Sequence, residues 1–66
     1  MQIILNGEPR DIAADATIGS VLATLAVPQK TIVVQQNGDI VARAEFETTP
    51  LMEGDTIELI RFVGGG

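Results

Sequence analysis

The fold is decided by the stretch Thr17–Pro28, which reads TIGSVLATLAVP. Thr17 is a favourable residue for the N-cap of a helix, and Pro28 disfavours helical geometry at the residue before it. Between them, large apolar residues recur at positions i, i+3, i+4 and i+7, which places their side chains on one stripe of a helix: Ile18, Val21, Leu22 and Leu25. The pattern predicts a helix over about Ile18–Val27 that has one apolar face.

The segment before this helix has the pattern of a β-hairpin. Alternate residues of Met1–Leu5 share one apolar face if the segment is a strand. Asn6-Gly7 is a strong signal for a two-residue hairpin turn. We therefore expect Arg10–Ala14 to pair back on the first strand, with Ile12 facing the core.

The segment after the helix predicts a second hairpin. Thr31–Gln36 is rich in β-branched residues, and the turn signal Asn37-Gly38 separates it from Ile40–Ala42. Residues 43–50 show no clean period, so we expect a loop or a short helical turn there, from which Phe46 fills the core.

The last predicted strand is Thr56–Val63. Its alternation places Ile57 and Leu59 on the core face, and Ile60 and Phe62 on the opposite face. One amphipathic helix has one apolar stripe, and a mixed sheet has one apolar face to receive it. The sequence therefore predicts a two-layer α+β fold.

The composition argues against an enzyme. Sixty-six residues are enough for one small core but leave no interior for an enclosed active site. The chain has no cysteine, histidine, tyrosine or tryptophan, which removes the thiol nucleophile, the commonest general base and metal ligand, and the usual base-stacking groups. We therefore expect residues 1–66 to form a single domain with no catalytic residue and no bound metal.

The formal net charge of −5 opposes binding to nucleic acids and to anionic membranes. No apolar run approaches the ~20 residues that span a bilayer, and the first residues lack the features of a signal peptide, so we expect a cytoplasmic protein. The acidity suits a protein partner with a basic surface. An equally good interpretation is that the acidity only keeps the protein soluble.

The sequence ends in three glycines, which a fold does not need there. Glycine has no Cβ and is the most mobile residue, so we expect residues 64–66 to form a mobile tail. Such a tail extends at most ~10–11 Å, which is enough to thread a narrow slot on a partner. The rest of the sequence offers no other candidate reactive group, so the carboxylate of Gly66 is the candidate. Gly64 and Gly65 are the candidates for threading through the partner's site.

The residues just before the tail are candidates for docking a partner. An apolar pair beside a reactive end, Ile60 and Phe62, would form a docking patch together with Val63. Arg43 is a candidate for binding a carboxylate of the partner. The alternatives are that Ile60 and Phe62 pack beneath residues 43–50, and that Arg43 is a surface residue without a role.

Five motifs follow one another along the whole chain: MQIILNGE at Met1–Glu8, ATI at Ala16–Ile18 leading into Val21-Leu22, NGDIVAR at Asn37–Arg43, EGDTIE at Glu53–Glu58 and RFVGGG at Arg61–Gly66. Each motif alone is weak evidence for a family, but the order of all five in so short a chain is specific evidence. Together they resemble the ThiS family, the sulfur carrier proteins of thiamin biosynthesis, which have the ubiquitin-like β-grasp fold. One departure is Ala42, where members of the family often carry proline before the arginine.

The resemblance implies a definite mechanism. A ThiF-like adenylating enzyme would use ATP and Mg to convert the Gly66 carboxylate into an acyl-adenylate. A sulfurtransferase carrying a persulfide would then deliver sulfur, displace AMP and leave a thiocarboxylate on Gly66. A ThiG-like thiazole synthase would take that sulfur into the thiazole ring of thiamin. This chain would itself bind no cofactor.

Two other functions stay open. The small subunit of molybdopterin synthase and the ubiquitin-like modifiers resemble this family in fold, in the terminal Gly-Gly and in their activation, and differ in the acceptor. A function of another class would be a non-covalent β-grasp binding module whose glycine tail is idle.

Overall fold

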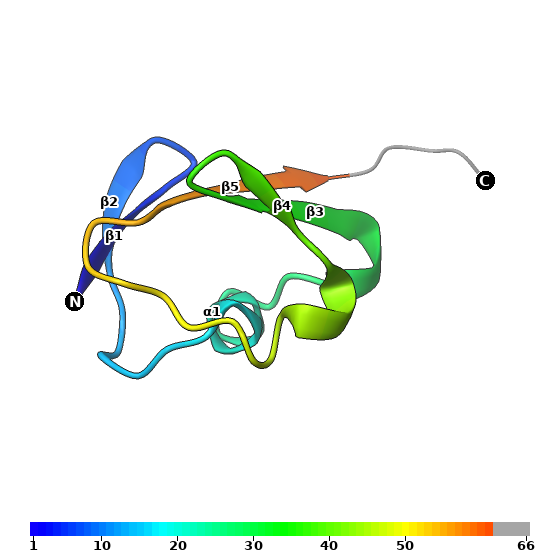
Figure 1. Ribbon diagram of the computed structural model, residues 1–66, viewed down its shortest axis with the longest axis horizontal. Helices are drawn as coiled ribbons and strands as arrows, with labels where there is room; N and C mark the ends of the chain where they lie inside the picture. Colours follow the sequence, from blue (N-terminus) through cyan, green and yellow to red (C-terminus); the bar gives the residue numbers. More distant parts are fainter. Residues whose placement is uncertain (62–66) are drawn as a thin grey trace.

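A five-stranded sheet and one α-helix dominate the structure, a computed structural model that describes residues 1–61. The elements follow in the order β1 (Gln2–Leu5), β2 (Glu8–Asp11), α1 (Ile18–Thr24), η1 (Gln29–Thr31), β3 (Ile32–Gln36), β4 (Asp39–Val41), η2 (Arg43–Glu45) and β5 (Thr56–Arg61), where η marks a 3-10 helix. The strands lie in the order β2-β1-β5-β3-β4. β1 and β5 are parallel, and the other neighbours are antiparallel. Figure 1 shows the sheet as one layer and α1 below it as the second, which confirms the predicted two-layer α+β, β-grasp arrangement.

Both predicted Asn-Gly turns are present. Asn6 and Gly7 have φ angles of 48° and 83°, and Asn37 and Gly38 have φ angles of 52° and 90°. Positive φ at both central residues is the mark of a type I′ turn, whose twist matches that of the flanking strands. Asparagine and glycine adopt positive φ more readily than other residues. The two hairpins are therefore determined locally, by their turn residues.

The second strand lies earlier in the chain than the sequence predicts. β2 is Glu8–Asp11 rather than Arg10–Ala14, because a two-residue turn places Glu8 directly opposite Leu5. Ile12 lies just beyond the strand, where its backbone N–H donates to the carbonyl of Met1 over 2.7 Å. Its side chain is half-buried and packs against the core, as expected.

The helix begins as predicted and ends earlier. The Thr17 hydroxyl accepts a hydrogen bond from the backbone N–H of Ser20 (3.2 Å), and the Ser20 hydroxyl accepts one from the N–H of Thr17 (2.9 Å), which together form a capping box. α1 then ends at Thr24, three residues before the predicted Val27. The predicted end was wrong because Ala26 has a φ of 57°, which ends the helix before the chain reaches Pro28.

The core lies between α1 and the inner face of the sheet. Its fully buried side chains come from all parts of the fold, and the largest are Phe46, Ile3, Ile18, Leu22, Ile57 and Val34. Phe46 is only 1% exposed, which confirms that it fills the core from the segment after β4. The alternation predicted for the last strand is also present as far as Arg61, with Ile57 buried and Ile60 exposed.

Residues 43–50 cross the molecule beside the first turn of α1. The N–H of Gly19 donates to the carbonyl of Phe46 over 2.8 Å, and the N–H of Ile18 donates to the carbonyl of Thr49 over 3.1 Å. The approach is so close that a Cβ at position 19 would collide with the carboxylate of Glu47. These bonds hold the helix against the segment that leads into β5.

Candidate functional site

β5 is the strand that carries the predicted site, because the chain continues from Arg61 directly into residues 62–66. It is the central strand of the sheet, with β1 on one side and β3 on the other. Its pairing with β3 runs without a break from Gln36 opposite Ile57 to Ile32 opposite Arg61. Figure 1 shows that β5 ends on the side of the molecule away from Met1. The predicted site is thus attached to a strand that is held over its whole length.

A buried carboxylate fixes the beginning of β5. Asp55 is 8% exposed and accepts hydrogen bonds from Nε2 of Gln36 (2.9 Å), Nδ2 of Asn37 (3.0 Å) and the backbone N–H of Met52 (2.9 Å). Burial alone would raise the pKa of the Asp55 carboxyl, but the bonds from Asn37, Met52 and Gln36 together outweigh burial and lower it below its usual value. Asp55 therefore ties the β3–β4 turn to the start of β5 as a charged group.

An apolar patch lies on the outer face of the sheet, opposite the core. It consists of Val33 on β3, Ile40 on β4 and Ile60 on β5, and we call it the outer patch. Ile60 is 46% exposed and lies directly across from Val33, while Ile40 is 70% exposed on the edge strand. Ile60 lies on the face of β5 opposite the buried Ile57 and is exposed, so residues 43–50 do not cover it. Its exposure leaves Ile60 available for the docking role that the sequence predicts, which stays a prediction.

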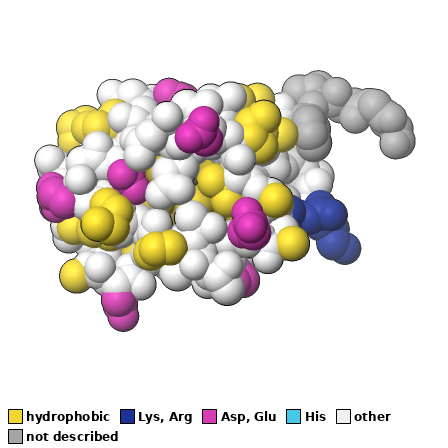
Figure 2. Space-filling model, in the orientation of Figure 1, with side chains coloured by type: hydrophobic (Ala, Val, Ile, Leu, Met, Phe, Trp, Pro, Cys, Tyr) yellow, Lys and Arg dark blue, Asp and Glu magenta, His cyan; other side chains and the backbone are white. Residues whose placement is uncertain are grey.

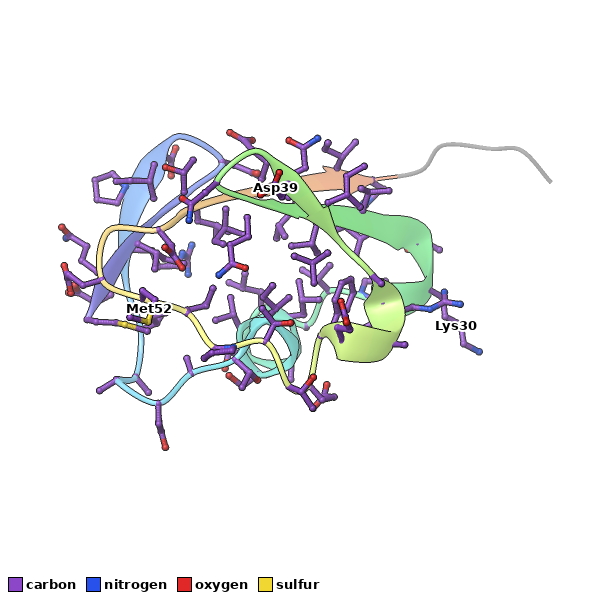
Figure 3. All side chains as sticks on the ribbon, in the orientation of Figure 1. Lys30, Asp39 and Met52 are labelled. Carbon is purple, nitrogen blue, oxygen red and sulfur yellow. The ribbon has the colours of Figure 1, made fainter. Side chains whose placement is uncertain are left out.

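Three basic residues lie at the end of the molecule where β5 finishes. Arg43, the predicted carboxylate-binding residue, is exposed and places its Nη1 atom 3.5 Å from the carbonyl oxygen of Lys30. Arg61 is exposed and pairs with Ile32, two residues after Lys30. Figure 2 shows basic side chains at this end, and Figure 3 shows Lys30 projecting away from the body there. The sequence alone indicates no role for Lys30 or Arg61, because only the strand pairing and the position of η2 bring them near Arg43.

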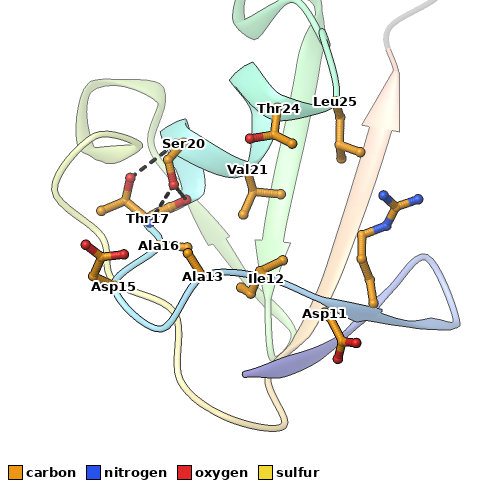
Figure 4. A pocket seen from close by; sticks show the side chains of 11 residues that line it. Asp11, Ile12, Ala13, Asp15, Ala16, Thr17, Ser20, Val21, Thr24 and Leu25 are labelled. Carbon is orange, nitrogen blue, oxygen red and sulfur yellow. Dashed lines mark hydrogen bonds between the residues drawn. The ribbon is translucent and has the colours of Figure 1, made fainter.

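A groove of about 420 Å³ opens between the end of β2 and α1, on another part of the surface. Figure 4 shows that its wall is formed by residues 10–16 on one side and the exposed edge of α1 on the other. Ile12, Val21 and Leu25 provide apolar lining, and Arg10 is also among the lining residues. Neither Arg43 nor Ile60 lines this groove, so it is separate from the predicted docking surface.

The remaining predicted site residues lie outside the described part of the chain. They are Phe62, Val63, Gly64, Gly65 and Gly66. Within residues 1–61, the structure brings together no group of three Asp, Glu, His or Cys side chains that could hold a metal ion. No helix in the same range is both long and apolar enough to cross a membrane. The roles of the five residues, and the expectation that the chain holds no metal, stay predictions.

This chain is similar in sequence and fold to small proteins that are named sulfur carriers or thiamine biosynthesis proteins. The model of the ThiS family matches residues 3–66. The sulfur carrier protein ThiS of Bacillus subtilis is 33% identical over 63 residues, which cover 94% of this chain and 96% of that protein. The crystal structure of a thiamine biosynthesis protein, ThiS, from Geobacter metallireducens has a TM-score of 0.86 with this structure, at 32% identity and with 100% of both chains covered.

A larger relative contains the same kind of region. A thiazole synthase of Paramagnetospirillum magneticum is 32% identical over 66 residues, which cover 100% of this chain and 20% of that protein. This chain therefore spans a fifth of the length of that relative.

Proposed function

Because the chain belongs to the ThiS family, we propose that it is a sulfur carrier of thiamin biosynthesis whose working group is the carboxylate of Gly66. The observation that carries the proposal is the family match over residues 3–66, which includes the glycines at the end of the sequence. The structure supports it by placing Arg61, the last described residue, at the end of a central strand that pairs with β3 up to that residue. A partner would then find the end of β5 at a defined place.

The proposed chemistry begins with activation. A carboxylate is a poor electrophile because its negative charge is delocalised and it lacks a good leaving group. A ThiF-like adenylating enzyme would join the Gly66 carboxylate to the α-phosphate of ATP and release pyrophosphate, with Mg neutralising the phosphate charge. The resulting acyl-adenylate has AMP as its leaving group. ATP and Mg are bound by that enzyme in this proposal, and the carrier supplies only the carboxylate.

Sulfur transfer follows from the activated carbonyl. The terminal sulfur of a persulfide on a sulfurtransferase system attacks the carbonyl carbon of Gly66, and AMP leaves. A thiol reductant then cleaves the sulfur–sulfur bond, which leaves a thiocarboxylate on the carrier and regenerates the thiol of the donor. Since the chain has no cysteine of its own, it offers no internal thiol that could capture the activated carbonyl.

The proposed acceptor is a ThiG-like thiazole synthase. A region similar to this chain makes up a fifth of a protein that is itself named thiazole synthase, which supports a functional link between the two. The small subunit of molybdopterin synthase remains the competing function, and it would differ in the acceptor alone. The named relatives favour the thiamin pathway.

The proposal is tested by the intact mass of the carrier after incubation with a ThiF-like adenylating enzyme, Mg-ATP and a persulfide donor. We expect one oxygen to be replaced by sulfur, with fragmentation mapping the change to Gly66. The control variant lacks Gly66, so it ends in the sterically similar Gly65 but is one residue shorter, and it should not gain sulfur. An unmodified wild-type chain would contradict the carrier function and favour a non-covalent binding module.

A further inference from the structure

We infer that Lys30, Arg43 and Arg61 form a docking surface for an acidic patch on the adenylating enzyme, and we call these three residues the basic end. The inference rests on the proposed function and adds the chemistry of the partner's contact surface. It follows from where the fold places its few positive charges.

The basic end is assembled by three separate elements. Lys30 lies in η1, Arg43 begins η2 and Arg61 ends β5. The contact of Arg43 Nη1 with the carbonyl of Lys30, at 3.5 Å, brings the first two together, and the pairing of Arg61 with Ile32 places the third beside them. All three side chains are exposed. The fold therefore gathers three like charges where dispersal would lower their mutual repulsion.

This gathering contrasts with the rest of the molecule. The sequence has four basic residues against nine acidic ones, and three of the four belong to the basic end. The fourth, Arg10, lies on β2 and lines the groove beside α1. The molecule thus carries a local positive charge within an overall negative one. Net charge alone predicts a basic partner, whereas the charge at this end of β5 predicts an acidic one.

Three acidic residues, Glu45, Glu47 and Glu58, lie on the same or neighbouring elements but have other surroundings among the described residues. Glu47 accepts a hydrogen bond from Nε2 of Gln29 over 3.1 Å and lies against Gly19 of α1. Glu58 lies opposite Gln35, in the middle of the sheet and on its outer face. Glu45 follows Arg43 by two residues within η2, so its side chain leaves that short helix in a different direction.

The basic end and the outer patch meet at the end of β5, on opposite faces of the sheet. Ile60 and Arg61 are consecutive residues of a strand, so their side chains point to opposite faces of the sheet. A partner that encloses the end of β5 would meet an apolar surface on one side and the basic end on the other. Interfaces are enriched in arginine and their buried centres are apolar, so one partner could contact both surfaces.

The test compares variants of equal charge in the adenylation reaction. Lys30→Gln, Arg43→Gln and Arg61→Gln each remove one positive charge, and Arg10→Gln removes the same charge elsewhere. The readouts are KM and kcat for pyrophosphate release by the ThiF-like enzyme at low salt. We expect each single variant of the basic end to raise KM by more than about twofold, and the triple variant by about tenfold or more, with kcat unchanged, because the lost attraction slows encounter. Arg10→Gln should change KM by less than about twofold.

Salt dependence provides a second readout. The difference in KM between wild type and the triple variant should shrink at 0.5 M salt, because ions screen exposed charges. If the triple variant keeps the KM of Arg10→Gln while the wild type is adenylated normally, the inference fails and the carrier function stands. If the wild type is not adenylated at all, the carrier function fails and the inference fails with it.

Discussion

Ala26 holds a backbone conformation that alanine seldom adopts. Its φ of 57° lies in the left-handed region, where a Cβ crowds the backbone. The N–H of Val27 donates to the carbonyl of Leu22 (2.9 Å) and the N–H of Ala26 to that of Ala23 (3.1 Å), which is the Schellman arrangement that commonly has glycine at this position. The helix end is therefore well bonded and locally strained.

Replacing Ala26 by glycine should stabilise the protein. We expect Ala26→Gly to raise the free energy of unfolding by about 0.5–1 kcal/mol, because glycine adopts positive φ without the steric cost. Urea unfolding followed by circular dichroism measures the change. Ala23→Gly is the matched control, since the same substitution inside α1 should lower stability by about 0.5–1 kcal/mol. Equal signs for the two variants would contradict the assigned helix end.

Asp55 makes stability depend on pH. Its pKa is lowered in the folded protein, because hydrogen bonds to Asn37, Met52 and Gln36 outweigh the opposing effect of burial. A carboxyl whose folded pKa is depressed contributes stability that is present above its unfolded pKa of ~3.9 and is lost as the pH falls through the folded value. Acid should therefore weaken the junction between the β3–β4 turn and β5.

Asp55→Asn should remove this pH dependence and cost stability at neutral pH. We expect a loss of about 1–3 kcal/mol at pH 7, because the amide group cannot accept all three hydrogen bonds, and a smaller loss near pH 3. Unfolding free energies at the two pH values measure both. Asp39→Asn is the control, since Asp39 is exposed at the β3–β4 turn (Figure 3) and should change stability little. If Asp55→Asn lowered the free energy of unfolding equally at both pH values, the proposed role of the Asp55 charge would be contradicted.

At the scale of elements, the sequence predicts those features whose signals are local. The Asn-Gly turns and the capped start of α1 depend on a few neighbouring residues, and the structure confirms them. The limits of β2 and α1 were wrong because they depend on the register set by a turn and on a left-handed residue. The basic end was missed for a similar reason, because pairing between distant segments brings it together.

Ile60 tests whether the outer face of β5 serves docking. We expect Ile60→Thr to leave stability within about 1 kcal/mol of wild type, because threonine keeps the β-branched shape at this exposed position. The same change should weaken binding to the adenylating enzyme by about three- to tenfold, because an apolar contact is lost. Isothermal titration measures the affinity.

Ile40→Thr is the comparison on the same face. Ile40 lies on the edge strand and farther from Arg61, so its replacement should weaken binding less than that of Ile60. If both variants bound the adenylating enzyme with wild-type affinity, the outer patch would not be part of the interface.

At the scale of the whole molecule, the two ends of the described chain lie apart. Met1 donates its terminal amine to the carbonyl of Ile12 over 2.8 Å, and Figure 1 shows this end opposite the finish of β5. Ile60 of the outer patch and Arg61 of the basic end are both at the finish of β5. The beginning of the chain should therefore stay free when a partner binds.

A polypeptide added before Met1 should leave activation intact. We expect an N-terminal fusion to be adenylated with kcat and KM within about twofold of wild type, and to change stability by less than about 1 kcal/mol, because the amide N–H of Met1 can still donate to Ile12. One alanine added after Gly66 should instead abolish sulfur loading, because the carboxylate is displaced from its place. Pyrophosphate release and intact mass measure the two outcomes. Loading of the lengthened chain would contradict the assignment of Gly66.

The parallel pairing of β1 with β5 also has a consequence for biosynthesis. The ribosome makes β1 first and β5 last, yet β5 must insert between β1 and β3 to complete the sheet. Before β5 emerges, the nascent polypeptide has two separate hairpins with no strand between them, and such long-range pairing forms late. A prematurely terminated product would stay open to proteases. Folding to the native state therefore requires that the chain has been translated at least through β5.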